Sequence, residues 1–484
     1  MKSGIISLAF LFISLPIFSQ QIDSIPYFST HLGEERLLTI WKPADYSPEE
    51  KYSTIYTFDA EWMFGLLTGM VAYYSGEGVE KIPPSIVIGI HFKDRNEDMG
   101  IGWDKEGLDE QGQKFKSYVE KELIPYVESH YSTSGFSSIF GHSNSSTFLN
   151  YFLFQEDPTF TAYAPISQYL LPTDSSEIAK WLPKHRQDKS LYYFLTSAEK
   201  DAPFRLQSGI DHERLFGKLA PKISFEHLIL PRADHLTMAA QAIPFALEGL
   251  YKDFQHMDES KATAIARAAD EKAIPFVDRE LERVGKIFGL QMKWNINDYF
   301  FAYEMASVQR DETSVAEITQ KYNRENPDDK SMYFIEGQVY ESMESLQKAK
   351  ESYLRNLQIN VDAGYFSHFR LIDILDRKLK EAALAIEVAE MGIAKEIDIQ
   401  LHYQLAKVAA KHQIKMELGL KHLHIFEEKY DSSIGIEREY IHLRKGQLLE
   451  ALGQKSQARE EFEKALQLNP EFELAKSALG NLGY

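Results

Sequence analysis

Short apolar runs and amphipathic helical stretches alternate along residues 22–255. Runs such as residues 53–58, 85–90 and 191–195 are rich in β-branched and aromatic residues. They lack strict polar alternation, as do strands that are covered on both faces. Stretches such as residues 115–130 instead place their apolar residues at helical spacing. Strands that alternate with helices predict a mostly parallel sheet with helices on both faces.

Residues 265–484 have a helical pattern almost throughout, and the polar residues 258–261 predict a linker before them. Small and aromatic positions recur in this half of the chain. One set is Gly446, Gly453, Ala458, Phe462, Ala465 and Pro470, and much of it returns 109 residues earlier as Gly337, Tyr340, Ala349 and Tyr353, with Ala383 as a trace between them. The spacing is close to three units of about 34 residues and resembles tetratricopeptide repeats. The pattern predicts an all-α solenoid of four or five repeats, and an unrelated helical bundle is the alternative.

The first twenty residues predict a cleaved secretory signal peptide. Lys2 supplies the positive charge, residues 5–18 are apolar, and the small Ser19 ends the stretch. A membrane anchor is the alternative, but the apolar run is short for a membrane crossing. The chain has no cysteine and therefore no disulfide, which favours a bacterial periplasm or exterior over a eukaryotic extracellular space. We expect a secreted or periplasmic bacterial protein that is not inserted in a membrane after cleavage.

The composition of the 484-residue chain narrows the classes of function. Its formal net charge is −19, which disfavours binding to a nucleic-acid backbone. The sequence shows no convincing metal-ligand spacing and no glycine-rich phosphate loop. We therefore expect neither a metal nor a cofactor.

Residues 141–146, Gly-His-Ser-Asn-Ser-Ser, are the strongest candidate for a nucleophile. They follow the apolar run 138–140 and precede a helical pattern over residues 147–155. This strand–turn–helix order is that of a nucleophile elbow, with Ser143 at its tip. The residues two before and two after the serine must be small so that strand and helix can pass closely. Gly141 meets this requirement, whereas Ser145 exceeds glycine by one hydroxymethyl group.

A carboxylate and a histidine follow the serine in the order that this elbow requires. Asp201 lies in a turn just after the apolar run 191–195, and Glu199 in the same turn is a second candidate for the acid. His235 ends the next strand-like run and precedes a helical stretch. A serine, a histidine base and an orienting carboxylate form the set that activates a hydroxyl for attack on a carbonyl.

The first half of the chain resembles the putative-esterase family of α/β-hydrolases, and the matching residues occur in the same order along the chain as in the family. This family includes esterase D-like enzymes, siderophore (enterobactin-type) esterases and feruloyl esterases. The resemblance covers about residues 25–252. The residues that carry it are 32–36, 56–61, 88–90 with Arg95 and Asp98, 140–143, 157–163, 166–167 and 233–235. The family's elbow usually has glycines where Ser145 and Ser146 stand, and its second-strand motif usually has glycine where Ala60 stands.

The resemblance implies an α/β-hydrolase fold with Ser143 as nucleophile, His235 as base and Asp201 as acid. It also implies an oxyanion hole made by the amide of Asn144 and an amide of the turn formed by Ala60 and Glu61.

These observations predict a signal peptide over residues 1–20, an esterase domain over 22–255 and a tetratricopeptide-repeat domain over 265–484. The predicted function is a secreted serine esterase that hydrolyses a small-molecule, glycan or siderophore ester through an acyl-enzyme. The repeats would bind a protein partner or mediate self-association. Two alternatives remain: a degenerate hydrolase that serves as a scaffold, and an acyltransferase, because mycolyl-type transferases share the fold.

Overall fold

The computed structural model describes residues 21–76, 78–101, 107–170, 180–181, 190–219, 223–360 and 363–482. The predicted signal peptide, residues 1–20, lies outside the described residues. The chain forms two compact units. The first contains the residues up to His256 together with Arg279–Lys293, and the second contains Met257–Asp278 and the residues from Trp294 onward.

The first unit is built on one eight-stranded sheet. Its strands are β1 (Gln21–Ser29), β2 (Glu34–Lys42), β3 (Tyr52–Thr57), β4 (Ser85–Ile90), β5 (Thr133–His142), β6 (Ala162–Ile166), β7 (Leu191–Lys200) and β8 (Ile223–Asp234), in the spatial order β1-β2-β4-β3-β5-β6-β7-β8. Strands β3 to β8 are parallel to one another, as the sequence predicts. Strand β2 pairs antiparallel with β1 on one side and with β4 on the other. Only four residues, including Gly33 at φ 69°, join β1 to β2. A link this short can join only antiparallel strands.

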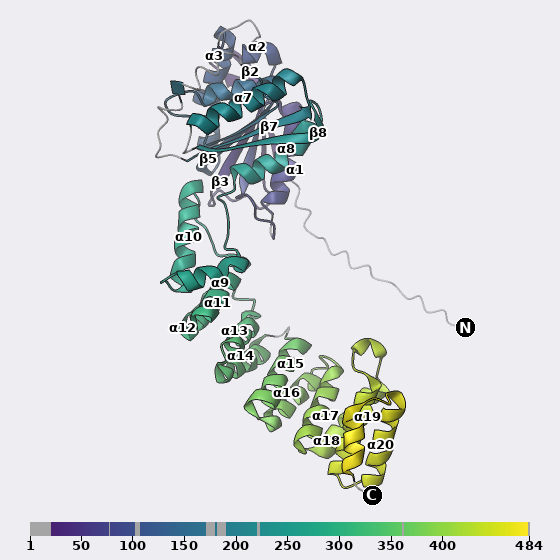
Figure 1. The fold of residues 1–484 in the computed structure, drawn as a ribbon. Helices are drawn as coiled ribbons and strands as arrows, with labels where there is room; N and C mark the ends of the chain where they lie inside the picture. The colour runs from purple at the N-terminus through teal and green to yellow at the C-terminus, as the bar shows by residue number, and fades with distance from the viewer. Residues whose placement is uncertain are drawn as a thin grey trace, which may run out of the picture. The chain divides into compact units, whose positions relative to one another are not determined.

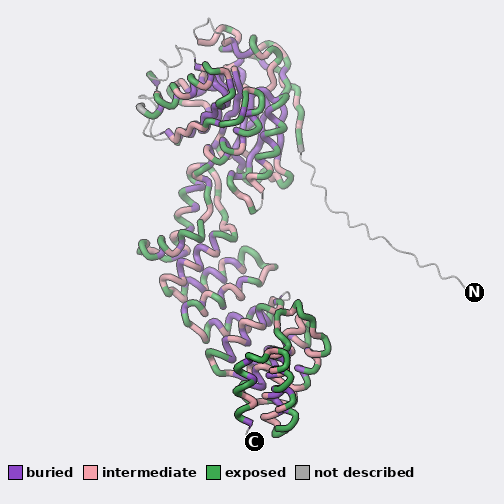
Figure 2. Tube along the Cα trace, turned by 45° about the vertical axis from the view of Figure 1, so that its right-hand side comes forward, coloured by how far each residue is buried: buried purple, intermediate pink, exposed green. Residues whose placement is uncertain are grey.

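Helices cover both faces of this sheet. They are α1 (Ala60–Tyr74), α2 (Arg95–Met99), α3 (Glu110–Tyr118), α4 (Ile124–His130), α5 (Asn144–Phe148), α7 (Pro203–Leu219) and α8 (Met238–Leu250), with a π-helical turn at Val119–Leu123 and a 3₁₀ turn at Leu149–Phe152. Neighbouring residues of one strand face opposite cores: Ile86 and Ile88 of β4 pack with residues of α3 and α7, and Val87 packs with residues of α1 and α8. Figure 2 shows the sheet buried between the two layers. The predicted α/β fold is therefore confirmed.

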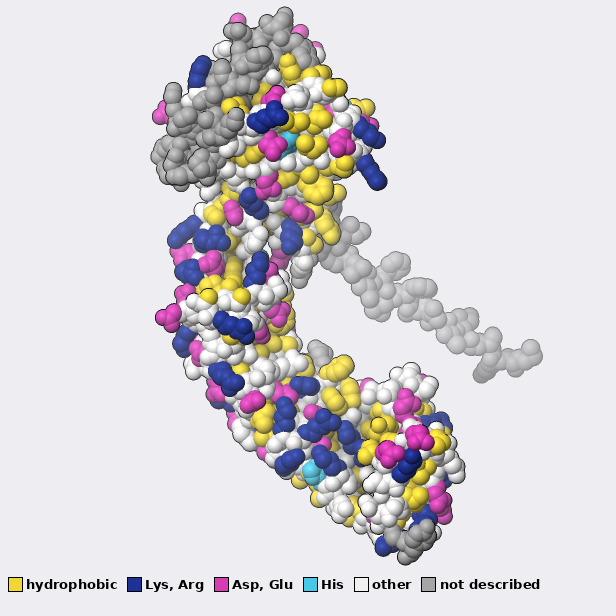
Figure 3. All heavy atoms as spheres, viewed as in Figure 1, with side chains coloured by type: hydrophobic (Ala, Val, Ile, Leu, Met, Phe, Trp, Pro, Cys, Tyr) yellow, Lys and Arg dark blue, Asp and Glu magenta, His cyan; other side chains and the backbone are white. Residues whose placement is uncertain are grey.

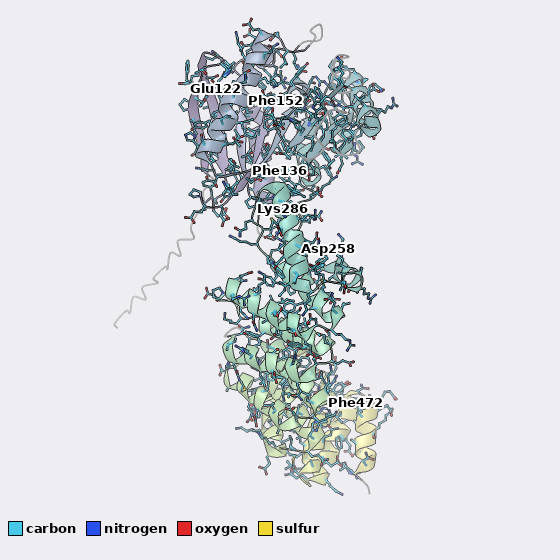
Figure 4. All side chains as sticks on the ribbon, turned by 90° about the vertical axis from the view of Figure 1, so that its left-hand side faces the viewer. Glu122, Phe136, Phe152, Asp258, Lys286 and Phe472 are labelled. Atoms are coloured by element: carbon cyan, nitrogen blue, oxygen red, sulfur yellow. The ribbon has the colours of Figure 1, made fainter. Side chains whose placement is uncertain are left out.

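The second half of α10 (Ala273–Phe288) belongs to the first unit. Phe288 is fully buried there, with its ring centroid 4.6 Å from that of Phe136 and 5.9 Å from that of Tyr251. Phe136 lies beside the end of α10 that carries Lys286 (Figure 4). Residues 258–261, which predict a linker, instead open helix α9 (Glu259–Ala268), because the Asp258 carboxylate accepts the amide of Ser260 and caps the helix.

The second unit consists of successive helices (Figure 1). After α9 and the first part of α10 come α11 (Ile296–Gln309), α12 (Glu312–Glu325), α13 (Met332–Ser342), α14 (Leu346–Ile359), α15 (Tyr365–Asp373), α16 (Ala382–Ala394), α17 (Gln400–His412), α18 (Met416–Glu428), α19 (Arg438–Ala451), α20 (Lys455–Leu468) and α21 (Glu473–Asn481), with a π-helical turn at Ile374–Leu379 and a 3₁₀ turn at Ser432–Ile434.

Small residues let paired helices of this unit approach closely. A Cβ added to Gly446 on α19 would lie 2.4 Å from the ring of Phe462 on α20. A Cβ added to Gly337 on α13 would lie 2.5 Å from the ring of Tyr353 on α14. The same glycine–aromatic contact thus recurs at the two places where the sequence period predicts it.

Acidic and basic side chains are interspersed over the helices of the second unit in the view of Figure 3. Several form ion pairs between helices, such as Glu341 with Arg370 and Asp376 with Lys411. Within the described part of the chain, every helix falls short of the length and apolar character that a membrane crossing requires.

We expect the substitution Phe288→Ala to lower the free energy of unfolding of the first unit by about 3–5 kcal/mol, because it empties a buried aromatic site. Phe28→Ala is the matched control, since Phe28 is 63% exposed on β1 and its loss is expected to change stability by about 0.5 kcal/mol or less. Hydrogen exchange of the β3 and β5 amides in urea measures both changes. Equal effects of the two substitutions would contradict the assignment of Arg279–Lys293 to this unit.

Candidate active site

The carboxyl ends of the parallel strands bring the predicted triad to one edge of the sheet. Ser143 directly follows β5, Asp201 directly follows β7, and His235 directly follows β8. Strands β5 to β8 are consecutive in the sheet and run in the same direction. Residues far apart in the sequence therefore meet at this edge, where open α/β sheets bind their ligands.

Ser143, His235 and Asp201 form a continuous hydrogen-bonded chain. The Nδ1 atom of His235 lies 2.9 Å from Asp201 Oδ1, and its Nε2 atom lies 3.0 Å from Ser143 Oγ. An Nδ1–H that donates to the carboxylate leaves Nε2 free to accept the proton of the serine hydroxyl. Of the two carboxylates that the sequence leaves open, the structure places Asp201 against His235, while Glu199 is exposed at the end of β7.

The backbone at Ser143 has the strained geometry of a nucleophile elbow. Its φ is 64° and its ψ is −124°, a conformation that residues other than glycine rarely adopt. The amide of Ser143 donates to the carbonyl of Ile166 at 2.9 Å, which anchors the turn to β6. A Cβ at Gly141 would lie 2.7 Å from the carbonyl oxygen of Ser145. Only glycine fits at position 141, in agreement with the small residue that the elbow pattern requires there.

Ser145, which stands where the resembling family usually has glycine, makes specific contacts through its hydroxyl. Ser145 Oγ accepts the amide of His142 at 2.9 Å and donates to Asp59 Oδ2 at 2.6 Å. Ser146 Oγ donates to the carbonyl of Ser143. Both serines are fully buried. Their hydroxyls therefore brace the elbow from inside, which sequence reasoning did not anticipate.

Asp59 links the elbow to the other predicted half of the oxyanion hole. Its buried carboxylate accepts Ser145 Oγ and two N–H groups of Arg95, whose guanidinium also donates to the carbonyl of His142. Ala60 directly follows Asp59 and begins α1. The first amides of a helix have no partner within the helix, and this applies to Ala60 and Glu61 in α1 as it does to Asn144 in α5.

Burial and hydrogen bonding set the charge states around the triad. Burial acts to raise the pKa of Asp201, but hydrogen bonds from His235, Ser167 and the Ala202 amide outweigh it and lower the pKa to about 2. Burial and the nearby His235 lower the pKa of His142 to about 4. His142 is therefore neutral near pH 7, and its Nε2–H donates to the carbonyl of His235 at 2.8 Å. This bond holds the backbone at His235.

Two polar residues contact the triad region without having been predicted as site residues. Ser167 directly follows β6 and its hydroxyl reaches Asp201. Arg205 of α7 donates to the side chain of Asn144. The position of Ser167 in the sequence could have indicated its place in the site, because a polar residue directly after a buried parallel strand lies at the same edge as the triad. Arg205 lies in a helix, and nothing in the local pattern marks it.

A separate cavity of about 630 Å³ lies at the opposite, amino-terminal edge of the sheet. It is lined by side chains that include Thr54, Ser137, Thr161, Arg283 and Lys286. Its lining mixes hydroxyl, cationic and anionic groups and includes no residue of the triad.

Comparison with known families supports the resemblance seen in the sequence. Residues 29–190 match the family described as "Putative esterase", and residues 439–472 match a tetratricopeptide repeat. The first match includes Ser143 and ends before Asp201 and His235, so the partners of the serine rest on the geometry above.

The similar proteins cover different shares of the chain. The uncharacterized protein YjcH of Bacillus subtilis (strain 168) is 32% identical over 112 residues, which are 22% of this chain and 43% of that protein. The chain thus spans less than half the length of this curated relative.

Two solved structures are also similar. An uncharacterised protein from Capnocytophaga ochracea DSM 7271 has a TM-score of 0.57 at 18% identity, with 72% of this chain and 98% of that chain covered. An IroE-like serine hydrolase from Shewanella oneidensis has a TM-score of 0.49 at 18% identity, with 68% and 99% covered. At this identity the Capnocytophaga structure shows the fold alone. The family matches confirm that residues 29–190 are those of an esterase-family domain and that residues 439–472 form a tetratricopeptide repeat.

Proposed function

We propose that this chain is a serine esterase that hydrolyses carboxylic esters through a covalent acyl-enzyme. The observation that carries the proposal is the hydrogen-bonded chain from Ser143 through His235 to Asp201 at the end of three parallel strands. The esterase-family match over residues 29–190 supports the same reaction class.

In the first half of the reaction, Ser143 Oγ attacks the ester carbonyl carbon while His235 Nε2 takes the hydroxyl proton. The imidazolium that forms is stabilised by the Asp201 carboxylate, which stays ionised because its pKa is about 2. The tetrahedral intermediate then expels the alkoxide, to which His235 returns the proton. The product is an alcohol, and the acyl group remains on Ser143.

In the second half, a water molecule replaces the alcohol. His235 Nε2 removes one proton from the water, whose oxygen attacks the acyl carbon, and the same proton then passes to Ser143 Oγ as the ester bond breaks. The carboxylic acid leaves and the free serine is restored.

The anionic oxygen of each tetrahedral intermediate would be bound by the amide of Asn144 and by an amide from the turn of Ala60 and Glu61. The contact between Asp59 and Ser145 supports this pairing, because it ties that turn to the elbow. Preorganised amide donors of this kind stabilise the developing charge by about 3–4 kcal/mol each.

The second unit would bind a protein partner or a second copy of the chain through its helical repeats. The match to a tetratricopeptide repeat supports this role, because stacked helix pairs expose extended surfaces for binding.

The substrate classes that suit this mechanism are a small acyl ester, a glycan ester and a siderophore lactone.

We expect Ser143→Ala to abolish labelling by a fluorophosphonate probe and to lower kcat for short p-nitrophenyl esters by about 10⁴-fold or more, because the nucleophile is lost. Ser208→Ala, which removes a buried hydroxyl outside the triad, is the control and should keep both the probe labelling and the kcat of the wild type. Turnover that survives in Ser143→Ala would contradict the mechanism. A transferred acyl group on an added alcohol, in place of free acid, would favour an acyltransferase.

The stability of the protein should depend on pH through Asp201. Its folded pKa of about 2 lies below the ordinary aspartate value, so its ionisation stabilises the folded state above about pH 4. That contribution is lost as the pH falls toward 2. Asp201→Asn is expected to give a shallower fall of Tm between pH 4.5 and about 2.5 than the wild type shows, while the exposed Glu199→Gln leaves the slope unchanged. Equal slopes for Asp201→Asn and wild type would rule out the hydrogen-bonded carboxylate.

We also propose that residues 1–20 direct export and are removed. Lys2 and the apolar residues 5–18 support this proposal. Expression of residues 1–484 in a bacterial host with a secretory pathway should yield protein in the periplasm or medium whose amino terminus begins near Gln21. A mature protein that keeps Lys2 would exclude cleavage.

A further inference from the structure

Ser167 occupies the position directly after β6, between the strands that carry Ser143 and Asp201. Its backbone has a φ of 59°, in the left-handed region that residues other than glycine rarely adopt. Two hydrogen bonds hold it there: its amide donates to the Thr196 carbonyl at 2.9 Å, and its carbonyl accepts Arg205 Nη1 at 2.5 Å. Backbone strain that is fixed in this way tends to occur at functional sites.

The hydroxyl of Ser167 contacts both the acid and the base of the triad. Ser167 Oγ donates to Asp201 Oδ2 and lies 3.0 Å from His235 Nδ1. The other carboxylate oxygen, Oδ1, accepts His235 Nδ1 at 2.9 Å and the Ala202 amide at 2.7 Å. Both oxygens of Asp201 therefore have donors, which prevents the carboxylate from rotating away from the imidazole.

Arg205 connects this arrangement to the nucleophile. The residue is 7% exposed, and its guanidinium donates through Nη1 to the Ser167 carbonyl and through Nη2 to Asn144 Oδ1 at 2.9 Å. Asn144 follows Ser143 and supplies one of the proposed oxyanion amides. The guanidinium of Arg205 thus links Ser167, which contacts Asp201 and His235, to Asn144, which follows Ser143.

We infer that Ser167 is a positioning residue of the triad, whose hydroxyl holds the Asp201 carboxylate toward His235 Nδ1 while Arg205 fixes the backbone of Ser167 relative to Asn144. This inference rests on the proposed esterase function. Ser167 acts through Asp201 and His235 and takes no proton from the substrate.

The substitution Ser167→Gly removes the hydroxyl and leaves the backbone conformation at position 167 unchanged. Glycine adopts a φ of 59° without strain, which offsets part of the stability lost with the hydrogen bond, so the variant should fold with a Tm within about 5 °C of the wild type. We expect kcat for a p-nitrophenyl ester to fall about tenfold, because a hydrogen bond to a charged carboxylate is lost, while KM changes less than about twofold. Ser208→Ala, at another buried serine, whose hydroxyl accepts the amide of Leu170, should leave both constants unchanged.

A double variant tests whether Ser167 acts through the carboxylate. In an Asp201→Asn background, Ser167→Gly should lower kcat by less than about twofold, because the two changes disrupt one unit and are not additive. Independent tenfold losses in both backgrounds would overturn the inference, as would a wild-type kcat in Ser167→Gly.

An NMR measurement tests the positioning role of Ser167 without relying on ester hydrolysis. The proton on His235 Nδ1 should give a downfield ¹H NMR signal, assigned by its loss in His235→Ala, and Ser167→Gly should shift it while Ser208→Ala leaves it in place. An unshifted signal overturns the positioning role. If the wild type neither hydrolyses esters nor reacts with the fluorophosphonate, the esterase proposal fails, and the NMR signal alone then decides whether Ser167 orients the pair.

Discussion

The site depends on how closely β5 and α5 pass each other at Gly141. Because position 141 has no Cβ, the carbonyl of Ser145 can lie against it, and the chain between them turns sharply enough to hold Ser143 at φ 64°. This turn lifts the serine hydroxyl above the edge of the sheet and toward His235. The hydroxyls of Ser145 and Ser146 then brace the turn through the His142 amide, Asp59 and the Ser143 carbonyl.

The parallel sheet supplies the second condition. Each of Ser143, Ser167, Asp201 and His235 is the first residue after its strand, so the register of four neighbouring strands sets their separation. Asp59 joins the same edge from β3, and the partly exposed Arg95 and the buried Arg205 cross-link the loops through their guanidinium groups. The chemistry is thus positioned by rigid elements, and side-chain hydrogen bonds complete the positioning.

The sequence predicted the parts of this arrangement that depend on local pattern. Apolar runs located β3, β4 and β7, and the order of Ser143, Asp201 and His235 matched the strand ends. The role of Ser145 could not be predicted, because its partner Asp59 is 86 residues away and only the folded sheet brings them together. The helical pattern of residues 265–484 likewise gave no indication that Phe288 packs against Phe136. The predicted helix over residues 147–155 is shorter in the structure, since α5 gives way to a 3₁₀ turn that ends at Phe152.

If Ser143 is the nucleophile, it carries the acyl group during turnover. The most direct test is mass spectrometry of the protein quenched in acid while it hydrolyses a p-nitrophenyl ester, followed by proteolysis. We expect the peptide that contains Ser143 to gain the mass of the acyl group and Ser143→Ala to show no such peptide. Ester hydrolysis with no acyl group on Ser143, or with the acyl group on another residue, would contradict it.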